Sequence, residues 1–302
     1  MHPMPPPTSP ASPCLWTAAT PQSKGGVIMF NTYDLFSMKG KNVLITGGRV
    51  MYGLGATMAL ADAGANLYLA SHSVESAREF VEQLSAEKGV KVTAVPFDQG
   101  DPASIEAMFQ TVIADAGSLD AFIHCSRTIP TSTKNGPTPW DTGDDAIEAN
   151  VRTNSAATIR MVQLAGQQMV KQHSGSIVVF GSMMGLIGVE KHNYDVPEQG
   201  TFGAPGAGGH TYAVDKSGLT AWIRHAASYY GQYGVRINAV CPGGLNSHRT
   251  SEDFARQYSK HTQLGRLANQ EDVSGLILTL ASDAGAYLTG LNIPIDGGYT
   301  AL

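Results

Sequence analysis

Short apolar runs alternate with longer amphipathic stretches along most of the chain, from about residue 41 onwards. The short runs are typical of buried parallel strands, and the stretches between them carry apolar residues at helical spacing. This alternation predicts repeated βαβ units around one parallel sheet. The expected strands are 42–46, 66–71, 91–96, 121–125, 176–181, 236–240 and 292–294, and the expected helices are 53–64, 74–87, 102–116, 144–172, 211–232 and 270–282.

No linker or internal repeat interrupts this pattern, so a second domain has no place to begin. We expect an α/β fold over residues 38–302: a single doubly wound domain with about seven parallel strands and helices on both faces. Residues 1–37 are expected to be a disordered N-terminal extension, because the first 28 are rich in Pro, Ser and Thr. Ordered patterning begins soon after Met29, so Met29 is expected as an alternative start of the chain.

Composition and charge narrow the classes of protein. The 302 residues are 42% hydrophobic with 34 glycines, which suits a well-packed α/β enzyme, and the net charge of −5 gives no basic surface for nucleic acid. The three cysteines, Cys14, Cys125 and Cys241, have no paired spacing, which favours a reducing cytoplasm and no metal site. The longest apolar stretch, 177–189, is shorter than the roughly 20 residues of a membrane helix, and the N-terminus lacks a signal-peptide pattern.

A glycine-rich segment joins the first expected strand to the first helix, from Thr46 to Gly55. Glycines let the backbone approach a pyrophosphate, and the free N–H groups of the helix stabilise that anion. The second strand ends in Ser71-His72, where an acidic residue would select NAD. Arg49 is near enough to reach a 2′-phosphate, so NADP is favoured over NAD, with Glu75 as the group that would serve NAD instead.

Tyr212 and Lys216 form a second motif. Positions i and i+4 share a helix face, so the ammonium can lie beside the phenol and stabilise its phenolate during proton transfer. The pair alone is common by chance. Its context is specific, however, because an apolar strand ending in Ser182 precedes it and the segment 234–247, GVRINAVCPGGLNS, follows it.

These segments, in this order, resemble the short-chain dehydrogenase/reductase family over about residues 38–302. The resemblance implies a Rossmann-type fold and hydride transfer between NADP or NAD and a ketone or secondary alcohol. The family turn T-G-x-x-x-G-x-G aligns onto Thr46, Gly47, Met51 and Gly53, with Met51 in place of the middle glycine. The family's N-N-A-G is replaced by the sequence 124–127, His-Cys-Ser-Arg.

The resemblance also implies residue roles. Ser182, Tyr212 and Lys216 would be catalytic together with an asparagine that holds a water; Asn150 and Asn154 are the candidates, and counting back from Gly175 favours Asn154. Cys125 is expected to be a small core residue and not a nucleophile. The expected cofactor-binding residues are Gly47, Arg49, Met51, Tyr52, Gly53, Ser71, His72, Asp98, Gln99, Cys125, Ser126, Tyr212, Lys216, Pro242, Gly243, Leu245 and Ser247.

Residues 183–210 show neither the helical nor the strand spacing of apolar residues. They form an expected substrate loop over the carboxyl edge of the sheet. Its polar residues favour a sugar-derived or polyol substrate over a long acyl chain, with a solvated insertion or an oligomer contact as the alternative. They are His192, Tyr194, Glu198 and His210. By resemblance the chain forms a homotetramer or dimer through the helices at 144–172 and 211–232. The rival functions are a 3-oxoacyl-thioester reductase, a nucleotide-sugar epimerase and a non-catalytic dinucleotide-binding regulator or scaffold.

Overall fold

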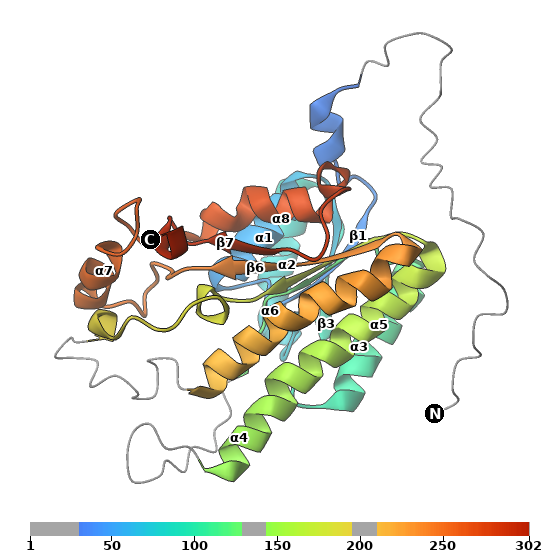
Figure 1. Cartoon of the computed structure of the whole chain (residues 1–302). Helices are drawn as coiled ribbons and strands as arrows, with labels where there is room; N and C mark the ends of the chain where they lie inside the picture. The colour runs from blue at the N-terminus through green and yellow to red at the C-terminus, as the bar shows by residue number, and fades with distance from the viewer. Residues whose placement is uncertain (1–29, 129–142, 195–209, 302) are drawn as a thin grey trace.

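The computed structural model describes residues 30–128, 143–194 and 210–301. Seven strands form one parallel sheet in the order β3-β2-β1-β4-β5-β6-β7, as Figure 1 shows. Strands β1 to β3 are added successively toward one edge of the sheet, and β4 to β7 toward the other, so the order of the strands switches between β1 and β4. This is the doubly wound arrangement that the alternating pattern predicts. The strands are β1 Asn42–Thr46, β2 Asn66–Ser71, β3 Val92–Pro96, β4 Ala121–His124, β5 Gly175–Phe180, β6 Val235–Pro242 and β7 Asn292–Ile295.

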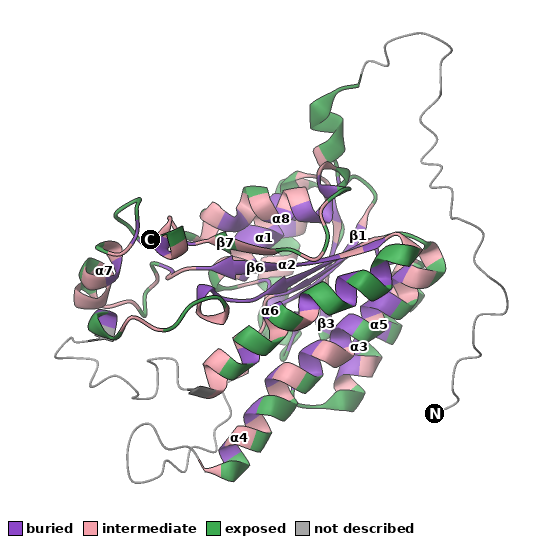
Figure 2. Cartoon of the chain, viewed as in Figure 1, coloured by how far each residue is buried: buried purple, intermediate pink, exposed green. Residues whose placement is uncertain are grey.

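Helices cover both faces of the sheet (Figure 1). The longer helices α3, α5 and α6 lie on one face, and α1, α2 and α8 lie on the other. The helices are α1 Met51–Asp62, α2 Arg78–Lys88, α3 Pro102–Ala116, α4 Asp144–Asn150, α5 Ala157–Gln172, α6 His210–Tyr230, α7 Glu252–Ser259 and α8 Ser274–Ala281. The central strands are buried between the two helix layers, whereas the edge strands β3 and β7 are partly exposed. The buried positions of the helices turn toward the sheet (Figure 2).

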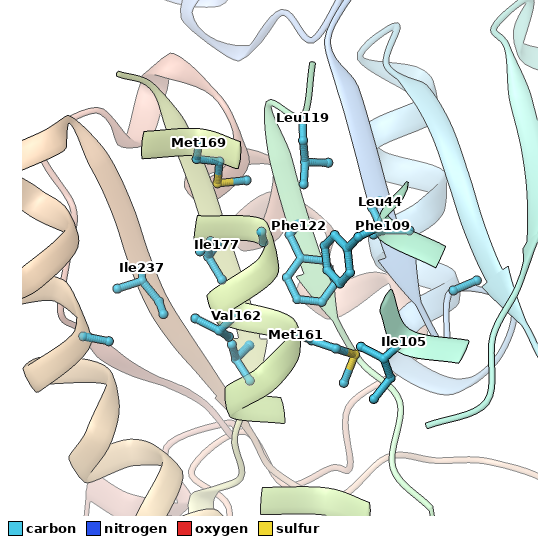
Figure 3. Packing of buried hydrophobic residues seen from close by; sticks show 14 of the residues in the cluster. Leu44, Ile105, Phe109, Leu119, Phe122, Met161, Val162, Met169, Ile177 and Ile237 are labelled. Carbon is cyan, nitrogen blue, oxygen red and sulfur yellow. The ribbon is translucent and has the colours of Figure 1, made fainter. Parts of the chain in front are cut away.

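The core consists of two apolar layers, one on each face of the sheet. Figure 3 shows part of the layer under α3 and α5, where Phe109 meets Phe122 edge to face with ring centroids 5.4 Å apart. Met161 and Ile177 in the same layer are fully buried. Full burial of one such side chain contributes roughly 1.5–3 kcal/mol. The rigid sheet that results fixes the carboxyl ends of the strands.

The structure confirms the α/β fold class and the seven strands, whose ends differ from the expected ones by no more than two residues. The expected helix 144–172 is divided into α4, a π-helical turn at Val151–Ala156 and α5. α7 was not expected. A short 3-10 helix at Thr32–Phe36, capped by Asn31, lies within the expected N-terminal extension, so regular structure begins before residue 38. Residues 1–29 lie outside the described part.

Residues 183–194 are more regular than the expected loop, because they contain 3-10 helices at Met183–Gly185 and Lys191–Tyr194. The following residues 195–209 are outside the described part. No helix among the described residues is long and apolar enough to cross a membrane.

Candidate active site

The glycine-rich turn lies at the carboxyl end of β1 and leads into α1. Gly47 has φ +70°, and Met51 has φ +54°, a left-handed conformation that costs a residue with a side chain about 1–2 kcal/mol. Met51 therefore adopts a left-handed backbone conformation that glycine adopts more easily, and the residue is 37% exposed to solvent. A Cβ atom on Gly53 would lie 2.1 Å from the Gly47 carbonyl oxygen, so the turn is closed too tightly for a side chain there.

The N-terminus of α1 offers free donors for an anion. Its N-cap residue, Val50, gives no side-chain hydrogen bond to the first turn. The N–H groups of that turn and the positive end of the helix dipole are therefore available to a phosphate group. This cradle fits the pyrophosphate of a dinucleotide.

Arg49 extends from the turn to the end of β2. Its guanidinium donates to Ser71 Oγ at 2.9 Å and to the Ser76 carbonyl oxygen at 2.7 Å. The alternative residue for NAD, Glu75, forms an ion pair with Arg78 instead. A guanidinium held at the end of the second strand fits a 2′-phosphate.

The neighbouring strand ends complete this region. Exposed His72 lies 3.8 Å from the carboxylate of Asp98, which follows β3. Gln99 is buried and accepts a hydrogen bond from Ser126 Oγ at 2.7 Å. The structure therefore brings the predicted residues after β2, β3 and β4 together at one edge of the sheet.

His124 and Cys125 lie at the end of β4, beneath the site. His124 is hydrogen-bonded through Nδ1 to Thr46 Oγ1 at 2.7 Å and through Nε2 to Thr158 Oγ1 at 2.9 Å. Burial, with a smaller contribution from the charge of Lys216, lowers the pKa of His124 to about 3, so the imidazole is neutral. Burial raises the pKa of the Cys125 thiol, which agrees with the expected core role and not with a nucleophile.

Lys216 and Tyr212 meet near the amino end of α6. The ammonium of Lys216 donates to the Phe180 carbonyl oxygen at 2.7 Å and lies 5.8 Å from the centre of the Tyr212 ring. Burial and then the nearby charge of Arg127 lower the pKa of Lys216 to about 8. Ser182 follows two residues after Phe180, is buried, and accepts a hydrogen bond from the Met184 N–H at 3.1 Å.

Both candidate asparagines belong to one buried polar network. Asn154, in the π-helical turn, donates to the Thr128 carbonyl oxygen at 2.9 Å and to Asn150 Oδ1 at 3.0 Å. Asn150 in turn donates to the carboxylate of Asp215, which also accepts from Ser155. π-helical turns are rare and are frequent at functional sites. Ser155 and Asp215 are members of the network that the sequence motifs did not identify.

Arg127 was noted in the sequence only as a departure from the family. Its guanidinium carbon lies 4.8 Å from the centre of the Tyr212 ring, and Nη2 donates to Asn150 Oδ1 at 3.4 Å. The signal available in the sequence was the positive charge of Arg127 at a position where the family has glycine.

A cavity of about 220 Å³ opens beside these groups, between the end of β4 and the helices α5 and α6. Its wall combines polar groups from the network with apolar side chains. The lining residues are His124, Ser126, Arg127, Asn154, Ser155, Thr158, Ile159, Phe180, Asp215, Lys216, Gly218, Leu219 and Trp222. Ser182 and Tyr212 are not part of this lining.

The segment after β6 faces the glycine-rich turn. Tyr52 Oη donates to the Gly243 carbonyl oxygen at 3.1 Å, so the two segments of the expected cofactor site touch. Leu245 pairs with Ala268 in an isolated bridge. Pro242 ends β6, and the hydroxyl of Ser247 lies 3.2 Å from Thr250 Oγ1.

The substrate loop is only partly described. His192 pairs with Glu190 at an exposed position and so is engaged locally. Glu198 and the side chains of Tyr194 and His210 lie outside the described part.

The family models and the most similar curated proteins all point to one family. The family model described as short chain dehydrogenase matches residues 41–194, and a model described as Enoyl-(Acyl carrier protein) reductase matches residues 199–300. The chain is 30% identical to an L-rhamnose 1-dehydrogenase (NAD(P)(+)) of Sphingomonas sp., covering 86% of this chain and 96% of the relative. It is also 30% identical to an NADP-dependent mannitol dehydrogenase of Hypocrea jecorina, covering 88% and 95%.

Solved structures agree. The crystal structure of gox2181 superposes with a TM-score of 0.75 at 27% identity, covering 90% of this chain and all 100% of that one. A putative short-chain alcohol dehydrogenase from Sinorhizobium meliloti superposes with a TM-score of 0.74 at 25% identity, covering 88% and 99%.

Proposed function

The chain belongs to the short-chain dehydrogenase/reductase family, whose members are NAD(P)-dependent oxidoreductases of alcohol and ketone groups, and from this premise we propose a sugar- or polyol-like substrate. The contact of Lys216 with the Tyr212 ring, at 5.8 Å, is the observation that carries the proposed chemistry. Relatives that act on mannitol and rhamnose, and a sorbose reductase of Candida albicans at 30% identity, support the substrate class.

The proposed reaction uses three side chains of this chain. When bound, the nicotinamide supplies or accepts the hydride. Ser182 hydrogen-bonds the substrate oxygen, and Tyr212 donates a proton to that oxygen during reduction. The ammonium of Lys216 stabilises the phenolate that remains, while its bond to the Phe180 carbonyl holds it in place.

Asn154 supports these groups from the π-helical turn. It lines the same cavity as Lys216, so a water held there would connect Lys216 to solvent. Its hydrogen bonds to Thr128 and Asn150 fix the side-chain amide. Asn154 is therefore proposed to be the fourth member of the catalytic set.

NADP is the proposed cofactor, with NAD as the alternative. The contacts of Arg49 with Ser71 and Ser76 place a positive charge at the end of β2. The NADP-dependent mannitol dehydrogenase among the relatives supports this preference.

A 3-oxoacyl-thioester reductase is the second candidate. A 3-oxoacyl-[acyl-carrier-protein] reductase of Staphylococcus aureus is 27% identical to the chain, covering 85% of this chain and 97% of the relative. The wall of the described cavity has both polar and apolar side chains, Leu219 and Trp222 among the apolar ones. The preference for a sugar- or polyol-like substrate over a thioester therefore rests on the relatives that act on rhamnose, mannitol and sorbose.

A cytoplasmic homo-oligomer, a tetramer or a dimer, is proposed with this function. The described cysteines, Cys125 and Cys241, are free thiols. Val214 and Tyr229 on α6 are 62% and 47% exposed, which leaves apolar surface on the helix expected at the interface.

The test has two steps. NADPH and NADH are titrated into the purified protein by fluorescence, and turnover is then measured with mannitol, sorbitol, rhamnose, fructose, sorbose and a 3-oxoacyl thioester. We expect tighter binding of NADPH and turnover on a polyol or ketose. Turnover on the thioester alone would reject the proposed substrate class, and binding of neither cofactor would reject the dinucleotide site.

A further inference from the structure

Arg127 is a cation at the candidate active site for which the proposed reaction has no use. It follows β4 and lines the cavity together with Lys216. Its guanidinium carbon lies 4.8 Å from the centre of the Tyr212 ring. A group bound by this guanidinium would therefore lie beside the Tyr212 ring.

The hydrogen bonds of Arg127 leave donors unused. Nη2 contacts Asn150 Oδ1 at the long distance of 3.4 Å. Nε is buried and has no hydrogen-bond partner within the described ranges. A buried donor without a partner is costly, so a guanidinium in this state is a ready binding group for an acceptor that enters the cavity.

Among the described residues that line the cavity, the positive and negative charges are not balanced. Arg127 and Lys216 are both cationic, and the carboxylate that lies near them belongs to Asp215. Both oxygens of Asp215 already accept hydrogen bonds, from Asn150 and from Ser155. Among the described residues, no aspartate or glutamate forms an ion pair with Arg127. The cavity therefore favours an anionic ligand.

We propose that Arg127 binds a carboxylate of the substrate, and that the substrate is a sugar acid or a related polyhydroxy acid. The guanidinium is planar, and its fork of N–H donors matches the two oxygens of a carboxylate. Nε and one Nη form such a fork, and Nε is the donor left without a partner. This inference rests on the proposed oxidoreductase function and adds the charge of its substrate.

The experiment compares matched pairs of substrates that differ in one group. Gluconate and sorbitol share a six-carbon polyol chain and differ in a carboxylate at one end, and glycerate and glycerol form a shorter pair. The ratio of kcat/KM for the acid to kcat/KM for the neutral partner is measured for the wild type, R127M and R127K. Arg152→Met is the control, because Arg152 is an exposed arginine on the neighbouring π-helical turn.

We expect the acid to be the better substrate of the wild type. A charge-assisted contact has a strength that corresponds to a ratio lowered roughly 10- to 150-fold in R127M. R127K keeps the charge but not the fork of donors, so its ratio is expected to lie between those of the wild type and R127M. R152M is expected to keep the wild-type ratio. An unchanged ratio in R127M would overturn the proposal, because a purely structural role of Arg127 would lower turnover of acid and neutral partner alike.

Two further arms separate the possible failures. The first arm measures the binding of gluconate to the NADPH-saturated protein by calorimetry, which reports on Arg127 even without turnover. If no compound in the set is oxidised, loss of this binding in R127M supports the proposal. Turnover of sorbitol with no binding or turnover of gluconate overturns the proposal and leaves the oxidoreductase function intact. A preference for sorbitol 6-phosphate over gluconate would assign Arg127 to a phosphate and overturn the carboxylate.

Discussion

His124 should make the stability of this protein depend on pH in a defined window. The buried imidazole is held between Thr46 and Thr158, and its pKa is lowered from about 6.5 to about 3. The folded state therefore keeps His124 neutral at pH values where the unfolded chain is already protonated. This contribution to stability is fully present above about pH 6.5 and is lost as the pH falls toward 3.

The size of the effect follows from that pKa difference. Each pH unit inside the window lowers the free energy of unfolding by about 1.4 kcal/mol per group. Integrated between pH 7.5 and pH 5.0, the loss due to His124 is about 2 kcal/mol. Three other described groups with shifted pKa values titrate mainly outside this interval: Asp115 and Asp272 have pKa values below their usual range, and Lys216 has a pKa of about 8.

The assay is urea unfolding, followed by circular dichroism at pH 7.5, 6.5 and 5.0 and constant ionic strength. The wild type and the control His225→Asn, an exposed position on α6, should lose about 2 kcal/mol more between pH 7.5 and 5.0 than His124→Asn. The His124→Asn protein is expected to be less stable at pH 7.5, because the shorter side chain cannot reach both threonines. An equally steep pH dependence in His124→Asn would refute the reasoning.

Two other substitutions test the cofactor site. Arg49→Ala should weaken NADPH binding roughly 10- to 150-fold, by loss of a charge-assisted contact, and leave NADH binding nearly unchanged in a fluorescence titration; equal loss for both cofactors would contradict the role of Arg49. Gly53→Ala places a Cβ atom 2.1 Å from the Gly47 carbonyl oxygen and should cost about 1–3 kcal/mol in urea unfolding and weaken both cofactors. Gly275→Ala on α8, where a Cβ atom would meet nothing within 4 Å, is the matched control and should be neutral or stabilising.

The fold was predictable because its signals are local. β1 and β2 are continuous apolar runs, and the structure places their ends where the pattern does. α7 was missed since it is only eight residues long and follows an irregular segment. The division of helix 144–172 was missed because a π-helical turn leaves the spacing of apolar residues almost unchanged.

The candidate site was predictable where residues are linked by spacing along one element. Tyr212 and Lys216 lie four residues apart, so their proximity follows from helix geometry. The contact of Arg127 with Tyr212 joins the end of β4 to α6, and it depends on side-chain directions that no local pattern encodes. The left-handed backbone of Met51 is a similar case, because a sequence rule would place glycine there.

The most direct test of the proposed chemistry is turnover by Tyr212→Phe, measured beside NADPH binding. Phenylalanine keeps the ring that contacts Arg127 and Lys216 and removes only the hydroxyl that would transfer the proton. With the best substrate of the wild type, we predict that kcat falls by at least 10²-fold while the Kd for NADPH changes less than threefold. Turnover at the wild-type rate would contradict the assignment of Tyr212 as the proton donor.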